Sequence, residues 1–179
     1  MKPRVWACFN VYKEAATALL SVRSVFDFAD IVLVIDGAYE IFPRESNEAW
    51  WSDDGTIEIM DEQCRKVGMP LLYVRGLWEN EVLKRNQYLQ IVPDNDWVLY
   101  IDGHEQLSFL PGVAEKVKAM IAQDECDWFA YTLTDWQQGR LINFEIQGLR
   151  LFRKVLGLHY KYNHYALYDA EEKYFQFNY

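Results

Sequence analysis

An apolar run at residues 97–101 ends at side chains that can bind a metal ion or exchange a proton: Asp102, His104 and Glu105. Such a run is typical of a strand buried on both faces, and open parallel sheets bind ligands beyond the carboxyl ends of their strands. In an extended chain Asp102 and His104 share a face and could bind one cation, while Glu105 points elsewhere. Gly103 between them lets a backbone or a ligand come close. The alternative is that these residues simply begin a polar loop.

The elements that must position these side chains alternate along the chain. Strands are predicted at 4–9, 31–35, 71–74, 97–101 and 127–134, and helices at 13–27, from 56 to about 68, 79–91 and 112–122. From residue 140 the pattern changes to mixed segments at 140–145 and 149–153, followed by Tyr-rich sequence. Alternation of this kind indicates a mostly parallel sheet with right-handed crossovers. The predicted fold class is α/β, with helices flanking a central sheet and a small mixed β part at the C-terminal end.

Composition limits the function. The 179 residues fit one domain, and a net charge of −9 argues against nonspecific binding to nucleic acid. A phosphorylated small ligand remains compatible with this charge if a divalent cation and a few basic side chains neutralise it. The three cysteines are far apart and form no C-x-x-C pair, which predicts reduced thiols and a cytoplasmic location. No apolar run approaches the roughly 20 residues of a membrane span, although a partner could provide peripheral membrane association.

A series of motifs stands in a characteristic order. These are Lys13-Glu14 after the first strand, Val34-Ile35-Asp36 at the end of the second, Ser52-Asp53-Asp54-Gly55-Thr56, Lys84-Arg85-Asn86, Asp102-Gly103-His104-Glu105, Leu149-Arg150-Leu151-Phe152-Arg153 and Asn163-His164. Their order and spacing resemble the family 2-like glycosyltransferases with the GT-A fold, especially the lipopolysaccharide-core type of sugar transferase. The resemblance covers nearly the entire chain. It departs from the family pattern at His104, which replaces a metal-binding Asp, and at residues 38–51, which form a longer loop.

The resemblance implies a GT-A-like single domain over residues 1–179 and a metal-dependent glycosyltransferase. Such an enzyme moves a sugar from a nucleotide-sugar, here a UDP-sugar, to the hydroxyl of a glycan, a lipid-linked or another acceptor, with inversion. Residues 1–105 would form the donor half. Residues 106–179 would form the acceptor side, in a protein that is either minimal or truncated.

The metal ligands implied are Asp102, His104 and His164. A cation that bridges two phosphates stabilises the charge that develops on the leaving nucleotide. Imidazole suits transition metals better than magnesium, so we expect Mn²⁺ rather than Mg²⁺. Alternatively, His104 is a surface loop residue and His164 belongs to an aromatic cluster.

Nucleotide contacts are implied for Asp36, Arg85, Asn86, Asp102 and Gly103. Asp36 could accept a hydrogen bond from a uracil N–H, or could form an ordinary Asp-Gly turn. Arg85 could pair with a donor phosphate or a nearby carboxylate, or remain a solvated helix charge. Asn86 is expected to face inward and to fix the loop at the strand end.

An inverting transfer also needs a carboxylate base close to the acceptor hydroxyl. Glu145, five residues before Arg150, is near the position that the resemblance gives to this base, and Asp135 is its rival. Both could instead be surface charges on strands.

Two other functions stay open. A scaffold protein could have kept the nucleotide site and lost turnover, and a nucleotidyltransferase would need a glycine-rich loop that residues 10–13 do not provide.

Overall fold

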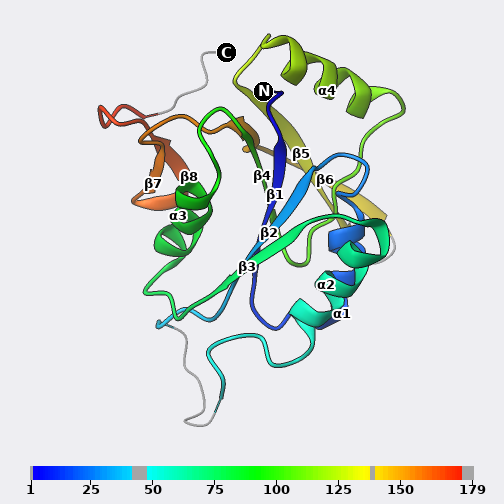
Figure 1. Ribbon diagram of the computed structural model, residues 1–179, viewed down its shortest axis with the longest axis vertical. Helices are drawn as coiled ribbons and strands as arrows, with labels where there is room; N and C mark the ends of the chain where they lie inside the picture. The colour runs from blue at the N-terminus through cyan, green and yellow to red at the C-terminus, as the bar shows by residue number, and fades with distance from the viewer. Residues whose placement is uncertain (1, 42–47, 138–139, 175–179) are drawn as a thin grey trace.

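A computed structural model describes residues 2–41, 48–137 and 140–174, with the side chains of 131–148 and 163–165 outside the described set. The larger sheet contains β1 (Val5–Val11), β2 (Ile31–Asp36), β3 (Leu71–Arg75), β4 (Trp97–Asp102), β5 (Trp128–Gln137) and β6 (Arg140–Arg153). Their spatial order is β3-β2-β1-β4-β6-β5 (Figure 1). The first four strands are parallel, whereas β6 runs antiparallel to both β4 and β5. A second sheet pairs β7 (His159–Lys161) with β8 (Asn163–Tyr168).

Helices cover both faces of the larger sheet. They are α1 (Ala15–Arg23), α2 (Thr56–Val67), α3 (Glu81–Ile91) and α4 (Val113–Gln123). Side chains of α1, α2 and α4 form one core with Ala7 and Phe9 of β1, while α3 and the β7–β8 sheet form the other core with Trp6 and Cys8. Alternate residues of a strand point to opposite faces, so a strand that is apolar throughout supplies both cores.

The predicted α/β class and the mostly parallel sheet are confirmed, with differences in detail at the ends of several elements. The first helix begins at Ala15 rather than 13, because Lys13 has a φ of 55°, outside the helical range. The segments predicted at 140–145 and 149–153 belong to one strand, β6. Its pairing with β5 shifts register at two places. Such irregularities interrupt the alternation that identifies a single strand in sequence.

The topology places a crevice at the centre of the sheet. β2 and β3 lie on one side of β1, and β4 lies on the other side. The boundary between β1 and β4 is therefore a switch point, where the order of the strands in the sheet changes direction. Ligands of open α/β sheets bind at the carboxyl ends of strands at such a switch point. The register brings Asn10 beside Asp102, and Val11 beside Asp36, at this edge.

Within the described parts of the chain, no helix is both long enough and apolar enough to cross a membrane.

Candidate functional site

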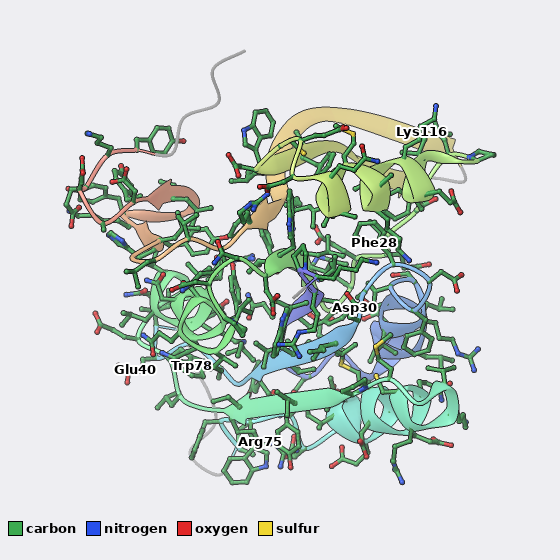
Figure 2. The ribbon with its side chains drawn as sticks, turned by 45° about the horizontal axis from the view of Figure 1, so that its top comes forward. Phe28, Asp30, Glu40, Arg75, Trp78 and Lys116 are labelled. Carbon is green, nitrogen blue, oxygen red and sulfur yellow. The ribbon has the colours of Figure 1, made fainter. Side chains whose placement is uncertain are left out.

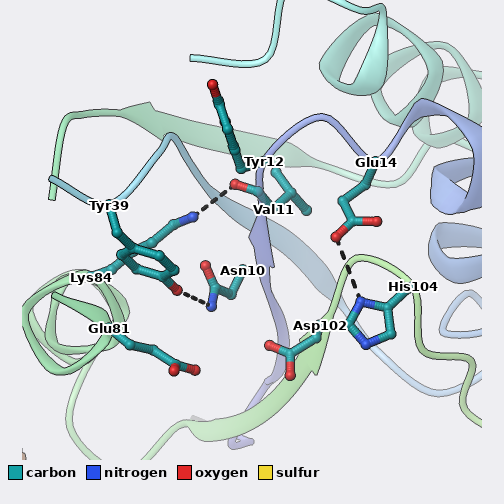
Figure 3. A pocket seen from close by; sticks show the side chains of 9 residues that line it. All are labelled: Asn10, Val11, Tyr12, Glu14, Tyr39, Glu81, Lys84, Asp102 and His104. Carbon is teal, nitrogen blue, oxygen red and sulfur yellow. Dashed lines mark hydrogen bonds and ion pairs between the residues drawn. The ribbon is translucent and has the colours of Figure 1, made fainter. Parts of the chain in front are cut away.

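A pocket of about 310 Å³ opens at the carboxyl ends of β1 and β4 (Figure 3). Its lining comprises Asn10, Val11, Tyr12, Glu14, Tyr39, Glu81, Lys84, Asp102 and His104. The structure thus places Asp102 and His104, two residues singled out by their sequence spacing, at one cavity. This cavity lies where the strand order predicts a ligand site.

Asp102 belongs to a chain of ion pairs. Its Oδ1 accepts a hydrogen bond from Nη2 of Arg85 at 2.8 Å, and Arg85 also pairs with Glu81 at 2.7 Å, one turn earlier on α3. Nη1 of Arg150 lies 3.9 Å from the other oxygen of Asp102. Arg150 also donates to both carboxylate oxygens of Glu105, at 2.8 and 2.9 Å. Arg85 is only 2% exposed and Arg150 only 4%, so water screens these interactions less than it screens surface pairs.

Tyr100 supports both guanidinium groups. The central carbon of Arg85 lies 4.5 Å from the centre of its ring, and that of Arg150 lies 4.4 Å away. Stacking of this kind favours arginine over lysine, because the planar guanidinium can bind a carboxylate and an aromatic face together. Of the two partners predicted for Arg85, a phosphate or a carboxylate, the structure shows the carboxylate.

Gly103 lies where the start of α1 approaches the end of β4. A Cβ atom at this position would lie 2.8 Å from Cγ of Glu14 and 2.9 Å from Cγ1 of Val11. Gly103 therefore leaves room for the chain's own Glu14, and its contact with a nucleotide stays a prediction. Glu14 in turn lies 3.5 Å from Nδ1 of His104, whose side chain is 64% exposed.

Replacing Gly103 with alanine should destabilise the protein by roughly 1–3 kcal/mol, because the added methyl must displace Glu14 and Val11. Urea denaturation measures this loss. The double variant with Glu14→Ala should recover part of it, since alanine lacks the Cγ atom that makes the closest contact. A double variant that shows no recovery would mean that the strain arises elsewhere.

Lys84 is a buried amine at the pocket. Its Nζ donates to the backbone oxygens of Val11 and Gly37, both at 2.7 Å, and lies 5.1 Å from the ring centre of Tyr39. Burial lowers the pKa of Lys84 to about 7, although Asp36 and Asp102 act in the opposite direction. Lys84 thus joins the carboxyl ends of β1 and β2 by bonds to the last carbonyl group of β1 and to that of Gly37, the residue after β2.

The lowered pKa of Lys84 predicts that stability depends on pH. Between pH 7 and 10 the unfolded chain keeps a proton on this lysine that the folded protein has lost, so the free energy of unfolding should increase with pH. We expect an increase of roughly 1 kcal/mol per pH unit relative to a Lys84→Met variant. Urea denaturation from pH 7 to 9 measures it, with Lys66→Met, an exposed lysine variant, as the control. Parallel curves for the wild type and Lys84→Met would contradict this account.

Asp36 has its carboxylate fully buried and already bonded. It accepts hydrogen bonds from the backbone N–H and the hydroxyl of Ser52, and lies 3.3 Å from Nε of Arg75. Its backbone oxygen accepts a hydrogen bond from the indole of Trp78, which lies near Glu40 in Figure 2. Asp36 therefore joins the Ser52 loop and β3 to the end of β2. Its contact with a base stays a prediction.

Asn86 faces inward, as expected, but it does not hold the loop after β4. Its side-chain amide donates to the backbone oxygen of Tyr160 at 3.0 Å and accepts from the backbone N–H of the same residue at 2.7 Å. This reciprocal pair attaches β7 to α3. The prediction that Asn86 fixes the loop at the strand end was therefore wrong, because the last strands of the chain cover this side of α3, and its contact with a nucleotide stays a prediction.

Three predicted site residues have side chains outside the described set: Asp135 on β5, Glu145 on β6 and His164 on β8. Their roles as base and metal ligand stay predictions.

Sequence reasoning gave no role at the site to Glu81, Lys84 or Tyr39, which line the pocket. The four-residue spacing of Glu81 and Arg85 was an available signal, since this spacing places two side chains side by side on a helix.

The described residues form no complete metal site by themselves. No three His, Cys, Asp or Glu side chains of the described set gather closely enough to hold an ion. Asp102 and His104 line the same cavity, however, with Glu14 beside His104. This donor set fits a cation that takes its remaining ligands from a bound diphosphate, which is how magnesium and related ions commonly bind at phosphate sites.

No protein-family model matches the sequence, and no curated protein matches it. Among solved structures, that of residues 1–349 of S. aureus TarS matches 84% of this chain and 47% of that 1–349 chain, with a TM-score of 0.54 and 15% identity. A second structure of S. aureus TarS covers 70% of this chain and 20% of that one, with a TM-score of 0.51 and 16% identity. A mannosyltransferase from Pyrobaculum calidifontis, solved with GDP-Man and Mn²⁺, covers 67% and 33%, with a TM-score of 0.49 and 18% identity.

The chain thus spans less than half the length of each of these proteins. At such low identity the likeness to TarS concerns the fold alone. It shows a GT-A-type fold, as the order of motifs predicted.

Proposed function

We propose that this protein is a glycosyltransferase of the family 2 type, which transfers a sugar from a UDP-sugar to an acceptor hydroxyl with inversion. The observation that carries the proposal is the pocket at the β1–β4 switch point of a GT-A-type fold, with Asp102 and His104 in its lining. In the reaction, the acceptor oxygen attacks the anomeric carbon and loses its proton to a base. The bond from that carbon to the diphosphate breaks, and UDP leaves with the electron pair.

The charge of the pocket supports a requirement for a divalent cation. Among the lining residues described, three are carboxylates, Glu14, Glu81 and Asp102, and Lys84 is the one lysine or arginine. A diphosphate would be repelled by this surface unless a cation accompanied it. Asp102 and His104 would hold the ion, with His164 as the third ligand that the family resemblance implies. The imidazole favours Mn²⁺ over Mg²⁺, and the ion would supply Lewis-acid stabilisation of the leaving diphosphate.

The remaining roles belong to the same proposal. Asp36 would contact the base of the nucleotide, and Glu145 or Asp135 would take the proton from the acceptor. Residues 1–105 would bind the donor and 106–179 the acceptor, which is a glycan, a lipid-linked saccharide or another hydroxyl compound. A cytoplasmic setting agrees with free thiols at all three cysteines.

A thermal-shift screen of nucleotide-sugars with Mn²⁺ present tests the proposal. At least one UDP-sugar should raise the melting temperature, because a ligand that binds only the native state stabilises it. The same UDP-sugar should then release UDP slowly in a hydrolysis assay. If neither UDP-sugars nor GDP-sugars raise the melting temperature, the assignment of the donor pocket is wrong.

A second function is favoured by one observation. Asp102, the main metal ligand proposed, already pairs with Arg85 at 2.8 Å. A protein that uses this pair only to stabilise its fold would bind a nucleotide without turnover, as a scaffold. Binding of UDP without release of sugar from any UDP-sugar, with acceptors supplied, would favour this second function.

A further inference from the structure

Lys84 has hydrogen-bonding capacity that the fold does not use. A protonated lysine has three N–H donors, and a neutral one has two. Two donors of Lys84 go to Val11 and Gly37, and the described residues provide no third hydrogen-bond acceptor for its Nζ. The fold therefore needs only the two donors that the neutral amine also has. The third N–H exists only on the ammonium group.

Lys84 lies at the pocket, where a ligand can reach this third donor. Lys84 is 1% exposed, yet it lines the pocket and is the only lysine or arginine among the lining residues described. The charged groups around it come from three elements: Asp36 on β2, Asp102 on β4, and Glu81 and Arg85 on α3. Figure 3 shows its side chain behind the ring of Tyr39, with Asn10 and Asp102 across the cavity.

We propose that Lys84 recognises the anionic part of the ligand, donates its third N–H to a phosphate oxygen, and takes up a proton when the ligand binds. This inference rests on the proposed function for the identity of the ligand, a nucleoside diphosphate. Lys84 would thus have two roles. It holds the ends of β1 and β2 together in either protonation state, and it adds a positive charge to the pocket only when an anion is present.

The consequence is a pH-dependent affinity. Burial lowers the pKa of Lys84 to about 7 in the protein without ligand, so about nine-tenths of the molecules carry the neutral amine at pH 8. Binding then requires a proton from solvent, so the affinity for the anion should fall as pH rises above 7, by up to about tenfold per pH unit. The phosphates of the ligand, with a pKa of about 6, lie below this window.

The test is calorimetric titration of the full chain with UDP and Mn²⁺ at pH 7.0, 7.5 and 8.0. Each titration is repeated in HEPES and in Tris, because the difference in heat between buffers counts the protons exchanged. The wild type and Lys66→Met should take up about half to one proton at pH 8 and lose affinity with pH. Lys84→Met should bind at least about tenfold more weakly, with little proton uptake and an affinity that does not change with pH. Lys66 is an exposed residue of α2 paired with Glu62, so its replacement is a matched control.

Several outcomes separate this inference from the proposed function. If UDP binds the wild type without proton uptake, Lys84 has a purely structural role and the inference is overturned, while the function stands. If pyrophosphate binds with Lys84-dependent uptake and no nucleotide binds, the inference is supported and the function is overturned. If neither UDP nor pyrophosphate binds the wild type, both are overturned. Should Lys84→Met fail to fold, the proton count of the wild type decides alone.

Discussion

Replacing Asp102 with asparagine should lower kcat/KM for sugar transfer by on the order of 10²–10³-fold, the usual cost of losing one group that stabilises transition-state charge. Asparagine keeps the size of the side chain but loses the negative charge that would hold the cation. The assay measures the release of UDP from whichever UDP-sugar raises the melting temperature of the wild type. Because the change is nearly isosteric, the variant should still unfold cooperatively.

The control for this variant is Asp61→Asn. Asp61 forms an exposed ion pair with Arg65 on α2, away from the pocket, so its replacement removes a charge without touching the site. It should retain the activity of the wild type. If Asp102→Asn stays within about a factor of three of the wild type, Asp102 does not stabilise the transition state.

The Arg85→Met variant should lose about 3 kcal/mol of unfolding free energy. Arg85 neutralises Asp102 and Glu81 from a position that is 2% exposed, so its loss leaves two carboxylates without their shared partner. Removing one partner of a buried pair typically costs about 3–5 kcal/mol. We expect the lower end, because both carboxylates keep some contact with water. Urea denaturation measures the loss.

Arg65→Met is the matched control for Arg85→Met. Arg65 makes the same kind of ion pair within a helix, but its side chain is 71% exposed. Surface pairs contribute less than about 1 kcal/mol, so this variant should be nearly as stable as the wild type. Equal stability of the two variants would show that the Arg85 pairs contribute no more than a surface pair.

The framework of the fold could be predicted from the sequence because its strands are apolar on both faces. Each of the runs at 31–35 and 97–101 ends at an Asp, and the structure ends both β2 and β4 at these residues. The long strand β6 could not be predicted as one element, since its bulged pairing with β5 breaks the alternation of side chains. That irregularity depends on the partner strand, which a local pattern does not contain.

The site could be predicted only in part, for a similar reason. Asp102 and His104 were found because they follow a buried strand. Lys84 was missed because a lysine on a helix is usually solvated, and only packing against the ends of two strands buries it. The partners of Asp36 and Asn86 also come from distant parts of the chain, Ser52 and Tyr160. Sequence patterns thus identified the residues at strand ends and missed the hydrogen bonds and the packing that these residues have in the fold.

The most direct test of the central claim is a calorimetric titration of UDP into the wild type and into Asp102→Asn, each with and without Mn²⁺. We predict that the wild type binds UDP tightly only when Mn²⁺ is present, because the carboxylates of the pocket repel the diphosphate alone. In Asp102→Asn the effect of Mn²⁺ on UDP affinity should largely disappear. Binding of UDP that is equally strong in all four titrations, or no binding of UDP to the wild type with Mn²⁺, would contradict the proposed donor pocket.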